Sequence, residues 1–430
     1  MLTDRVLLDV AYAFMLILTA TSAAGIILGT LQTVLSVNLL QSTSAGRKSR
    51  RKPPRSRPIN PGQETGSDSP LVSILKPVSG LEDGLQDNLE SFAQLRGIRY
   101  EVIISIADES DPAIEIVKRV LVCFPKGAAH LLVGRRRKVA NPKVERLIAA
   151  AKVARGDILF VSDSNVRVSP DDIARTVREF EDEEVGCVSN VFIGEGARTL
   201  GALLESLYLL IFVLPGNALA AWAGVPCVVG KSMALSRRVY EKLGGFEAFG
   251  QLLAEDQSIA VATKKAGYKV VLSPIVVRNI IEKRSVRQVI QRQVRWGKLR
   301  YSFSKPLYSI ELVLNPVPLI VLACFASKIF SPKYFPALLA CAVFTIAHRL
   351  CQSLVLMRSS GTRVSKLSVL LVPVQDMIQA AAQVVPYVSK EVNWRGFRTR
   401  LGPNSLILAA EQPSLKREYA PPVLSSTWQS

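Results

Sequence analysis

The hydrophobic residues of this 430-residue chain gather in long apolar runs near its two ends and in short segments between them. Residues 6–40 form a first run that is long enough to cross a bilayer. Past Lys305 three further apolar segments follow, at 307–330, 334–357 and 367–389. This pattern predicts a transmembrane anchor on the N-terminal side and further membrane segments on the C-terminal side.

Between these runs, short apolar strands alternate with amphipathic helices. The predicted strands cover 71–76, 100–107, 129–133 and 157–162, and the predicted helices cover 82–95, 111–124, 143–153 and 170–180. Such alternation predicts parallel strands joined by crossover helices, an α/β layer. Ligands of such sheets bind beyond the carboxyl ends of the strands.

The apolar stretch 199–224 is interrupted by Glu205 and by Pro215-Gly216-Asn217. We expect an interfacial or lipid-facing element of the central domain there, with a buried core helix as the alternative. Residues 227–236 then predict a central strand.

A cluster of basic residues follows the first apolar run: Arg47, Lys48, Arg50, Arg51, Lys52, Arg55 and Arg57. The positive-inside rule therefore places this flank in the cytosol and the N-terminus outside. The segment 367–389 has basic residues on both sides, which predicts that it lies in the interface or re-enters and does not cross.

These patterns predict a multi-pass integral membrane protein with five parts. We expect an anchor at 1–41, a basic flexible linker at 42–69 and a cytosolic domain at 70–305. Membrane segments at 306–389 and a basic cytosolic tail at 390–430 complete the chain.

The composition narrows the chemistry. A net charge of +19 beside 49% hydrophobic residues fits basic surfaces that face anionic headgroups or phosphates. The sequence has no zinc-finger or aromatic-basic RNA-binding pattern, so we expect no nucleic-acid partner. Six scattered cysteines and only two histidines argue against a disulfide framework, a zinc site and a Ser–His–Asp triad. We therefore expect catalysis to depend mainly on carboxylates, Arg, Lys and the backbone.

Three aspartates lie where such a domain would bind its ligand. Asp108 follows a predicted strand and could accept hydrogen bonds from a nucleoside, whereas the nearby Asp111 is expected to cap a helix. Asp163 also follows a strand, and its carboxylate could ligate Mg²⁺ or Mn²⁺ on a diphosphate. Its motif is Asp-Ser-Asn, without the second acid of Asp-x-Asp, and a turn-forming aspartate is the alternative.

The third aspartate, Asp256, lies beside Glu255 in LLAEDQSIA. It is the candidate general base that would deprotonate an acceptor hydroxyl. The alternative is an acidic helix N-terminus that the helix dipole favours.

A basic helix is predicted at 285–300, with the sequence SVRQVIQRQVRWGKLR. Arg292 and Arg295 are three residues apart, so they share a helical face and can meet a diphosphate together. Trp296 could anchor the helix at the membrane interface or stack on the acceptor. A helix that lies on anionic lipid is the alternative.

Together these motifs resemble the ceramide glucosyltransferase family, including its bacterial ceramide glycosyltransferase relatives. The resemblance covers roughly 70–305, and the motifs that carry it are SILKPVSG (73–80), DPAIE (111–115), NPKV (141–144), SDSNVRV (162–168), AEDQ (254–257) and RQVRW (292–296). It implies a GT-A fold with a mixed, mostly parallel sheet flanked by helices, a UDP-sugar donor, and a ceramide or similar lipid acceptor in a bilayer, here a bacterial inner membrane.

The resemblance also implies roles for individual residues. Asp108 and Asp163 match the family's first two aspartates, and Asp256 matches the presumed base of an inverting transfer. Arg295, with a divalent cation (Mg²⁺ or Mn²⁺) on Asp163, would stabilise the negative charge of the departing diphosphate. Four more residues would bind substrate: Lys76, Lys143, Arg292 and Trp296.

Two departures leave the sugar and the acceptor open. Ser189 or Asn190 stands where the animal enzymes have His, and AEDQ replaces AEDY. Glucose, galactose and glucuronic acid all stay possible, as does a hopanoid acceptor. A processive polysaccharide synthase would need more membrane spans. A non-catalytic scaffold that binds anionic lipid would not need the three aspartates.

Overall fold

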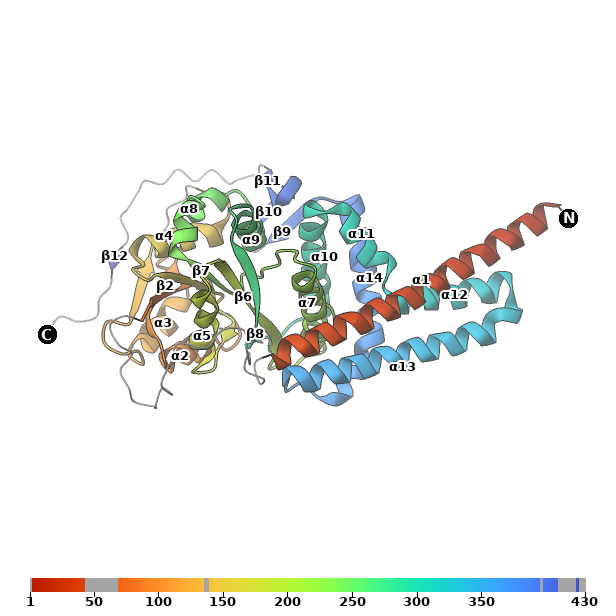
Figure 1. Ribbon diagram of the computed structural model, residues 1–430, viewed down its shortest axis with the longest axis horizontal. Coiled ribbons are helices and arrows are strands. Elements are labelled where there is room, and N and C mark those ends of the chain that lie inside the picture. Colours follow the sequence, from red (N-terminus) through yellow and green to blue (C-terminus); the bar gives the residue numbers. More distant parts are fainter. Residues whose placement is uncertain (1, 43–68, 135–138, 395–396, 409–422, 425–430) are drawn as a thin grey trace.

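The computed structural model describes residues 2–42, 69–134, 139–394, 397–408 and 423–424. An α/β domain forms one end of the molecule, and long helices project from it toward the N-terminus (Figure 1). The predicted linker 42–69, apart from its two end residues, lies outside the described residues, as does most of the predicted tail beyond Leu408.

A nine-stranded sheet forms the centre of the α/β domain, in the order β12-β3-β2-β1-β4-β7-β6-β8-β5. Its strands are β1 (Leu71–Pro77), β2 (Arg99–Ile106), β3 (Ala129–Val133), β4 (Ile158–Ser162), β5 (Val166–Arg167), β6 (Val185–Glu195), β7 (Ser232–Ser236), β8 (Lys269–Ile280) and β12 (Val423–Leu424). Strands β3, β2, β1 and β4 are parallel, as are β6 and β8, whereas β7 runs antiparallel between β4 and β6. The predicted mixed, mostly parallel sheet is confirmed.

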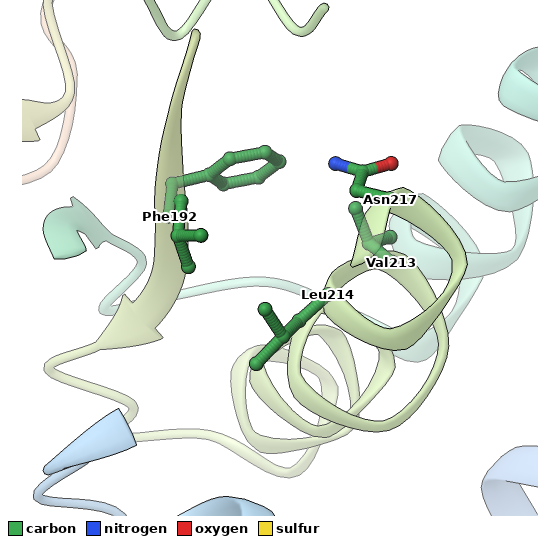
Figure 2. A pocket seen from close by; sticks show the side chains of 5 residues that line it. Phe192, Val213, Leu214 and Asn217 are labelled. Atoms are coloured by element: carbon green, nitrogen blue, oxygen red, sulfur yellow. The ribbon is translucent and has the colours of Figure 1, made fainter. Parts of the chain in front are cut away.

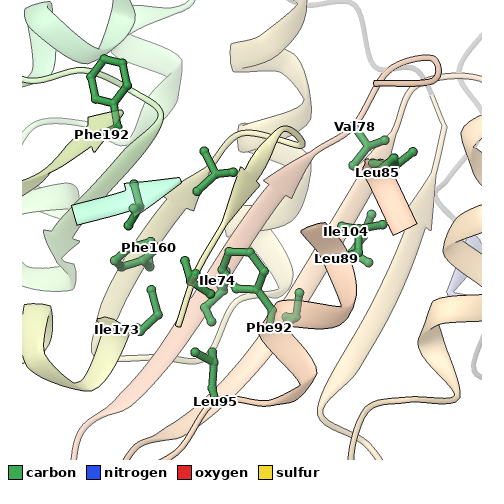
Figure 3. Close-up of a cluster of buried hydrophobic side chains, with 14 of the residues drawn as sticks. Ile74, Val78, Leu85, Leu89, Phe92, Leu95, Ile104, Phe160, Ile173 and Phe192 are labelled. Atoms are coloured by element: carbon green, nitrogen blue, oxygen red, sulfur yellow. The ribbon is translucent and has the colours of Figure 1, made fainter. Parts of the chain in front are cut away.

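Helices cover both faces of this sheet. They are α2 (Leu85–Ala93), α3 (Ala113–Leu121), α4 (Pro142–Val153), α5 (Asp172–Val177), η1 (Arg178–Glu181), α8 (Arg237–Lys242), η3 (Phe246–Phe249) and α9 (Glu255–Lys265). On β1, Ile74 packs with Phe92 of α2 in one buried cluster, shown in Figure 3, while Leu75 packs with Leu147 of α4 in another. Because successive side chains of a strand point to opposite faces, α2 and α4 lie on opposite sides of the sheet.

The apolar stretch around residue 210 is one continuous helix with a π-turn in its middle: α6 (Leu200–Tyr208), η2 (Leu209–Val213) and α7 (Leu214–Trp222). The π-turn precedes Pro215, which has no backbone N–H to donate to the helix. Leu207 and Leu210 are buried, whereas Trp222 is 66% exposed. The first part of this helix is therefore the buried core helix that was the alternative prediction for 199–224. An exposed apolar surface begins at its end.

The remaining helices are α1 (Leu2–Gln41), α10 (Val286–Phe303), α11 (Lys305–Val313), α12 (Pro316–Phe330), η4 (Pro332–Tyr334), α13 (Phe335–Ser360), η5 (Lys366–Leu371) and α14 (Val372–Val388). Among the described residues, four helices are long and apolar enough to cross a membrane, or up to five if the bent pair α11–α12 is one span. Met15 of α1 packs with Ile320 of α12 and Leu338 of α13, so these three form a bundle whose outer surface exposes large apolar side chains.

Helix α14 runs steeply across the direction of α1 and α13, next to α10 (Figure 1). The turn that leads through η5 into α14 contacts the α/β domain, and the end of α14 contacts α10. Before it, Arg278 of β8 donates to the carbonyl of Gly361 at 3.2 Å. After it, Lys298 of α10 donates to Ser389 Oγ at 3.1 Å. Helix α14 therefore lies between the α/β domain and the projecting bundle.

A small antiparallel sheet follows α14, with β9 (Glu391–Trp394), β10 (Phe397–Leu401) and β11 (Ile407–Leu408), and a short helix η6 (Pro403–Ser405). It is joined to the α/β domain, because the Leu253 N–H donates to the Ser405 carbonyl at 3.0 Å and the Ile407 N–H to the Gln251 carbonyl at 2.9 Å. The sequence analysis did not predict this sheet or its position beside α9.

Candidate active site

Asp163 lies between two lysines just past the carboxyl end of β4. Its Oδ1 is 3.0 Å from Lys143 Nζ and its Oδ2 is 3.3 Å from Lys231 Nζ. Burial would raise the pKa of Asp163, but these two ammonium groups hold that pKa well below its usual range. Asp163 is therefore an ionised carboxylate held at a fixed position at the edge of the sheet.

Lys143 joins Asp163 to the acidic motif of α9. Its Nζ is 2.9 Å from Glu255 Oε1 and donates to the Gly230 carbonyl at 3.3 Å. Burial would lower the pKa of Lys143, but the charges of Asp163 and Glu255, with a further contribution from Asp256, raise it above its usual value. The lysine is placed by Asn141, whose side chain caps α4 by accepting from the Lys143 and Val144 N–H groups.

Lys76 is fully buried at the end of β1, beneath the ion pairs. Its Nζ donates to the Asp163 carbonyl at 2.8 Å and to Ser162 Oγ at 3.3 Å, and lies 4.0 Å from the centroid of the Phe92 ring. Burial lowers the pKa of Lys76 to about 7, against the opposing effect of Asp163. This lysine supports the backbone of Asp163.

Lys231 was not predicted from the sequence. It is buried, donates to Asn165 Oδ1 at 2.8 Å and pairs with Asp163. Burial lowers the pKa of Lys231 to about 8, with Asp163 opposing and the positive charge of Arg292 adding to the decrease. The only sequence signal for it was the Gly-Lys pair that precedes β7, inside a segment predicted as strand. That strand begins only at Ser232, and the residues before it form a loop.

Asp256 lies in the first turn of α9, close to the same lysines. Its Oδ2 accepts from the Gly230 N–H at 2.6 Å, and its Oδ1 accepts from the Gln257 N–H at 2.7 Å. A Cβ on Gly230 would lie 2.7 Å from Lys143 Nζ and 3.1 Å from Asp256 Oδ2. A larger residue there would displace the lysine or the carboxylate, because the loop backbone lies close to both.

Three side chains at the two motifs noted above as departures hold the loop 226–232. Gln257 donates to the Pro226 carbonyl at 2.7 Å and accepts from the Val228 N–H at 3.2 Å. Ser189 accepts from the Val229 N–H at 3.3 Å, and Asn190 donates to Ser232 Oγ at 3.0 Å. These residues therefore fix the backbone that carries Gly230 and Lys231.

Asp108 lies at the same edge of the sheet, past the end of β2 and on the other side of β1. It is exposed, and its Oδ1 accepts from the N–H and the hydroxyl of Ser110 at 3.0 and 2.8 Å. Asp111 accepts from the Ala113 N–H at 2.9 Å, in agreement with its predicted capping role, and also from the Gly80 N–H.

Helix α10 begins with a capping box formed by Ser285 and Gln288 and carries the predicted Arg-Trp motif. Arg292 forms an ion pair with Glu205 of α6, which is almost fully buried. Trp296 packs 6.0 Å from the ring of Tyr208, so it contacts the core of the domain. Arg295 is half-buried on the same helix.

A divalent cation does not have a complete protein site here. Among the residues that the structure describes, no group of three His, Cys, Asp or Glu side chains is arranged to hold a metal. Asp163 is the carboxylate at the predicted position, and two ammonium groups contact its oxygens. A cation would be repelled by these lysines unless the negative charge of a diphosphate entered with it.

An apolar pocket lies beside the charged cluster, between β6 and the turn from η2 to α7 (Figure 2). It is narrow and partly open, and it is lined by Val191, Phe192, Val213, Leu214 and Asn217. Asn217 Oδ1 accepts from Cys227 Sγ at 3.1 Å, and Cys227 belongs to the loop that carries Lys231. The pocket therefore shares one wall with the charged site.

Two curated relatives support the resemblance. Ceramide glucosyltransferase 1 of Caenorhabditis elegans is 29% identical over 249 residues, which is 56% of this chain and 52% of the relative. Ceramide glucosyltransferase 3 of the same organism is 27% identical over 259 residues, which is 59% of this chain and 55% of the relative. The chain thus spans about half the length of the curated relatives it matches.

A solved structure with the same fold is a mannosyltransferase from Pyrobaculum calidifontis in complex with GDP-Man and Mn²⁺. It covers 87% of this chain and 99% of its own, with a TM-score of 0.52 and 18% identity. The predicted GT-A fold is confirmed.

The model for Glycosyl transferase family 21 matches residues 18–407. This match includes the α/β domain, the projecting helices and the sheet after α14, so it is not limited to the sugar-nucleotide domain that many glycosyltransferases share. The family predicted from the motifs is confirmed, and the chain belongs to glycosyl transferase family 21.

Proposed function

We propose that this chain is an inverting glycosyltransferase that moves a hexose from a UDP-sugar onto the primary hydroxyl of ceramide. One observation carries the proposal. Asp163 and Asp256 both lie near Lys143 at the carboxyl edge of the sheet, in a domain attached to an apolar helix bundle. A diphosphate donor and a lipid alcohol can meet only where these two surfaces adjoin.

The donor is proposed to bind along the carboxyl edge of β2, β1 and β4. Asp108 would accept hydrogen bonds from the nucleoside at one end of this edge. Lys231 and Lys143 would neutralise the diphosphate at the other, with Arg292 and Arg295 approaching from α10. Fixed positive charges in a partly buried site stabilise the leaving diphosphate without rearrangement during the reaction.

Asp256 is proposed as the general base. Its two N–H contacts, from Gly230 and Gln257, hold the carboxylate in one orientation and leave lone pairs to accept the acceptor's proton. As it loses its proton to Asp256, the acceptor hydroxyl would attack the anomeric carbon from the face opposite the diphosphate. This displacement gives a β-glycoside and UDP.

Asp163 and the donor's diphosphate oxygens would together hold Mg²⁺ or Mn²⁺. The bound cation would supply further neutralisation of the departing charge. Because Lys143 and Lys231 already contact Asp163, one lysine must give up its contact with this carboxylate for the cation to bind.

The proposed location is a bilayer crossed by α1, α12 and α13, with the α/β domain on the cytosolic side. The basic residues that follow α1 in the sequence support this orientation.

Expression of the chain in a host that makes no glycolipids tests the proposal. Mass spectrometry of the lipid extract is expected to show a new hexosylceramide with the wild-type chain and none with Asp256→Asn. A hexose found on a hopanoid would show that the acceptor is a hopanoid and not ceramide. A polysaccharide product with no glycolipid would contradict the proposal.

A further inference from the structure

Four glutamines lie buried along the contact between α10 and α14, and the proposed mechanism uses none of them. Gln293 of α10 is 1% exposed, and Gln375, Gln379 and Gln383 of α14 are 1%, 2% and 1% exposed. The three on α14 are four residues apart, so they form one row along a single helical face. We refer to these four side chains as the glutamine seam.

The two helices are in direct contact near the Gln383 end of this row. A Cβ on Gly297 would lie 3.3 Å from Pro386 Cγ, which places α10 and α14 against each other near the end of the seam. Gln293 lies one turn before Gly297 on the same buried face of α10. Tyr308 Oη, which is adjacent to Gly297, donates to the Gln383 carbonyl at 3.1 Å.

Within the described part of the chain, neither side-chain amide atom of any of the four glutamines has a hydrogen-bond partner. Other buried amides, such as Asn88, Asn141 and Asn190, both donate and accept, and Asn279 of β8 is an isolated buried amide without a partner among the described residues. A buried polar group without a partner destabilises a fold, and an apolar side chain of the same shape would remove that cost. Three such groups in one row on α14, with a fourth on α10, indicate that the seam binds a polar ligand.

The position of the seam indicates what that ligand is. It begins beside the Arg292–Trp296 motif and runs along α14, which lies across the base of the apolar bundle (Figure 1). Where it passes Gly297 and Gln383, the rings of Tyr301, Tyr308 and Tyr387 lie 5.0 to 6.0 Å apart. Tyrosines gather where protein meets the headgroup layer of a bilayer, so the seam lies at the depth of lipid headgroups.

We propose that the glutamine seam binds the uncharged polar backbone of the acceptor lipid, through its amide and hydroxyl groups. A carboxamide both donates and accepts, and therefore matches a lipid amide, which also does both. A phosphate headgroup would instead call for Arg or Lys. The inference rests on the proposed function and extends it, because the seam would select an N-acyl lipid over a lipid alcohol without an amide, such as diacylglycerol.

The test uses the full-length protein in nanodiscs, with Gln375→Met and Gln379→Met as variants of nearly unchanged shape. Gln352→Met is the control: Gln352 is a buried glutamine of α13 that packs against Gly29 of α1, and its Nε2 has no partner among the described residues. Its Oε1 accepts from Arg349, the ion-pair partner of Asp376, so this variant also tests a contact beside the seam that the proposal does not assign to the lipid. KM for ceramide, for diacylglycerol and for the UDP-sugar, and Tm, are measured for each.

We expect each seam variant to raise KM for ceramide by about three- to tenfold, the effect of losing one neutral hydrogen bond, with the donor KM unchanged. The ratio of the KM for diacylglycerol to the KM for ceramide is expected to decrease, while Tm stays equal or rises. The control is expected to leave every KM unchanged. Unchanged ceramide KM in both seam variants, with wild-type transfer intact, would overturn the inference and leave the proposed function standing.

A second measurement does not depend on the folding of any variant. Wild-type protein is photolabelled with a photoreactive ceramide, and the labelled peptides are identified. Labels within 286–303 and 372–388 support the inference, and labels confined to other segments contradict it. If wild-type protein transfers sugar to no lipid at all, the proposed function fails, and the inference with it.

Discussion

The charged side chains at the candidate active site form a chain of alternating sign from Lys231 through Asp163 and Lys143 to Glu255. Each member lies on a different segment of the sequence; Lys231 and Glu255 are buried, and Lys143 and Asp163 are partly buried. A buried charge without a partner is costly, so removal of any one of them would destabilise its neighbours as well as the bound donor. Substitutions that keep the size of the side chain are therefore the informative ones.

Asp256→Asn keeps the size of the side chain and removes its basicity. We expect kcat to fall by about 10²- to 10⁴-fold, the usual contribution of a general base, with UDP affinity nearly unchanged. Steady-state transfer assays and calorimetric titration with UDP measure the two effects. Asp182→Asn is the control, because Asp182 is half-exposed before β6 and pairs with Lys269 at the amino edge of the sheet. Full activity of purified Asp256→Asn would remove this residue from the chemistry.

Lys231 predicts a pH dependence of donor binding. With its pKa at about 8, the side chain is an ammonium below pH 7 and largely a neutral amine above pH 9. Since only the ammonium attracts a diphosphate, the dissociation constant of UDP-sugar is expected to stay level below pH 7 and to rise as the pH passes 8. Lys231→Gln should bind weakly at every pH, whereas the exposed Lys152→Gln should retain the wild-type profile. A rise that persists unchanged in Lys231→Gln contradicts the assignment.

The two lysines on Asp163 also predict the order in which metal and donor bind. Free protein is expected to bind Mn²⁺ poorly, because two ammonium groups repel it, and to bind it well once UDP adds negative charge. Titrations of Mn²⁺ followed by electron paramagnetic resonance, with and without UDP, measure this difference. Equal Mn²⁺ affinity in both titrations would contradict this order of binding. Full transfer activity after treatment with EDTA would contradict the assignment of a metal to Asp163.

The sequence predicted part of this site because strand ends are visible in a hydrophobic pattern. Asp163 and Asp256, with Lys76 and Lys143, were chosen from such positions and from the family motifs, and the structure brings these four together. Lys231 and the partner of Arg292 were not predicted. A buried ion pair joins segments that are far apart in sequence, such as Arg292 and Glu205, and nothing in the local pattern records it.

At the scale of elements, the alternating strands and helices up to β4 were predicted to within a few residues. The long strands β6 and β8 were not predicted, because both are interrupted by polar residues that are buried in this fold, such as Asn190 and Asn279. The sheet after α14 was not predicted either, since its strands are short and polar residues interrupt β9 and β10. Its stability depends on contact with residues 251–254, which the sequence does not show.

Helix α1 packs against the bend between α11 and α12 through a small residue. A Cβ on Gly25 would lie 2.3 Å from the Leu314 carbonyl oxygen, and nearby Ser22 donates to the Pro316 carbonyl at 3.0 Å. Gly25→Ala is therefore expected to destabilise the protein by about 1–3 kcal/mol through overpacking, as small residues let membrane helices approach closely.

The matched control for Gly25→Ala is Gly216→Ala in α7, where a Cβ would meet nothing within 4 Å. Alanine favours a helix over glycine by up to about 1 kcal/mol, so this variant is expected to be neutral or slightly stabilising. Thermal unfolding of both in detergent gives the comparison. Equal Tm for the two variants would mean that α1 is not packed against this bend.

At the scale of the whole molecule, the contacts at both ends of α14 restrict how the chain crosses a bilayer. The turn before α14 is tied to β8 and β6 through Arg278 to Gly361 and Arg363 to Glu195. The sheet after α14 is tied to the loop before α9. Since both ends contact one domain, an even number of crossings must separate α10 from β9. The hairpin of α12 and α13 supplies two, so α14 is expected to lie in the interface.

Single cysteines on a cysteine-free background test this arrangement with a membrane-impermeant maleimide. Lys333→Cys lies at the exposed tip of the hairpin and is expected to be labelled from the outer side of intact cells. Ser365→Cys and Lys390→Cys, exposed before and after α14, should be labelled only after the membrane is permeabilised. Labelling of these last two from opposite sides would mean that α14 crosses. The glutamine seam would then lie inside the bilayer, too deep to meet a headgroup, and the contacts that join both ends of α14 to one domain could not form together.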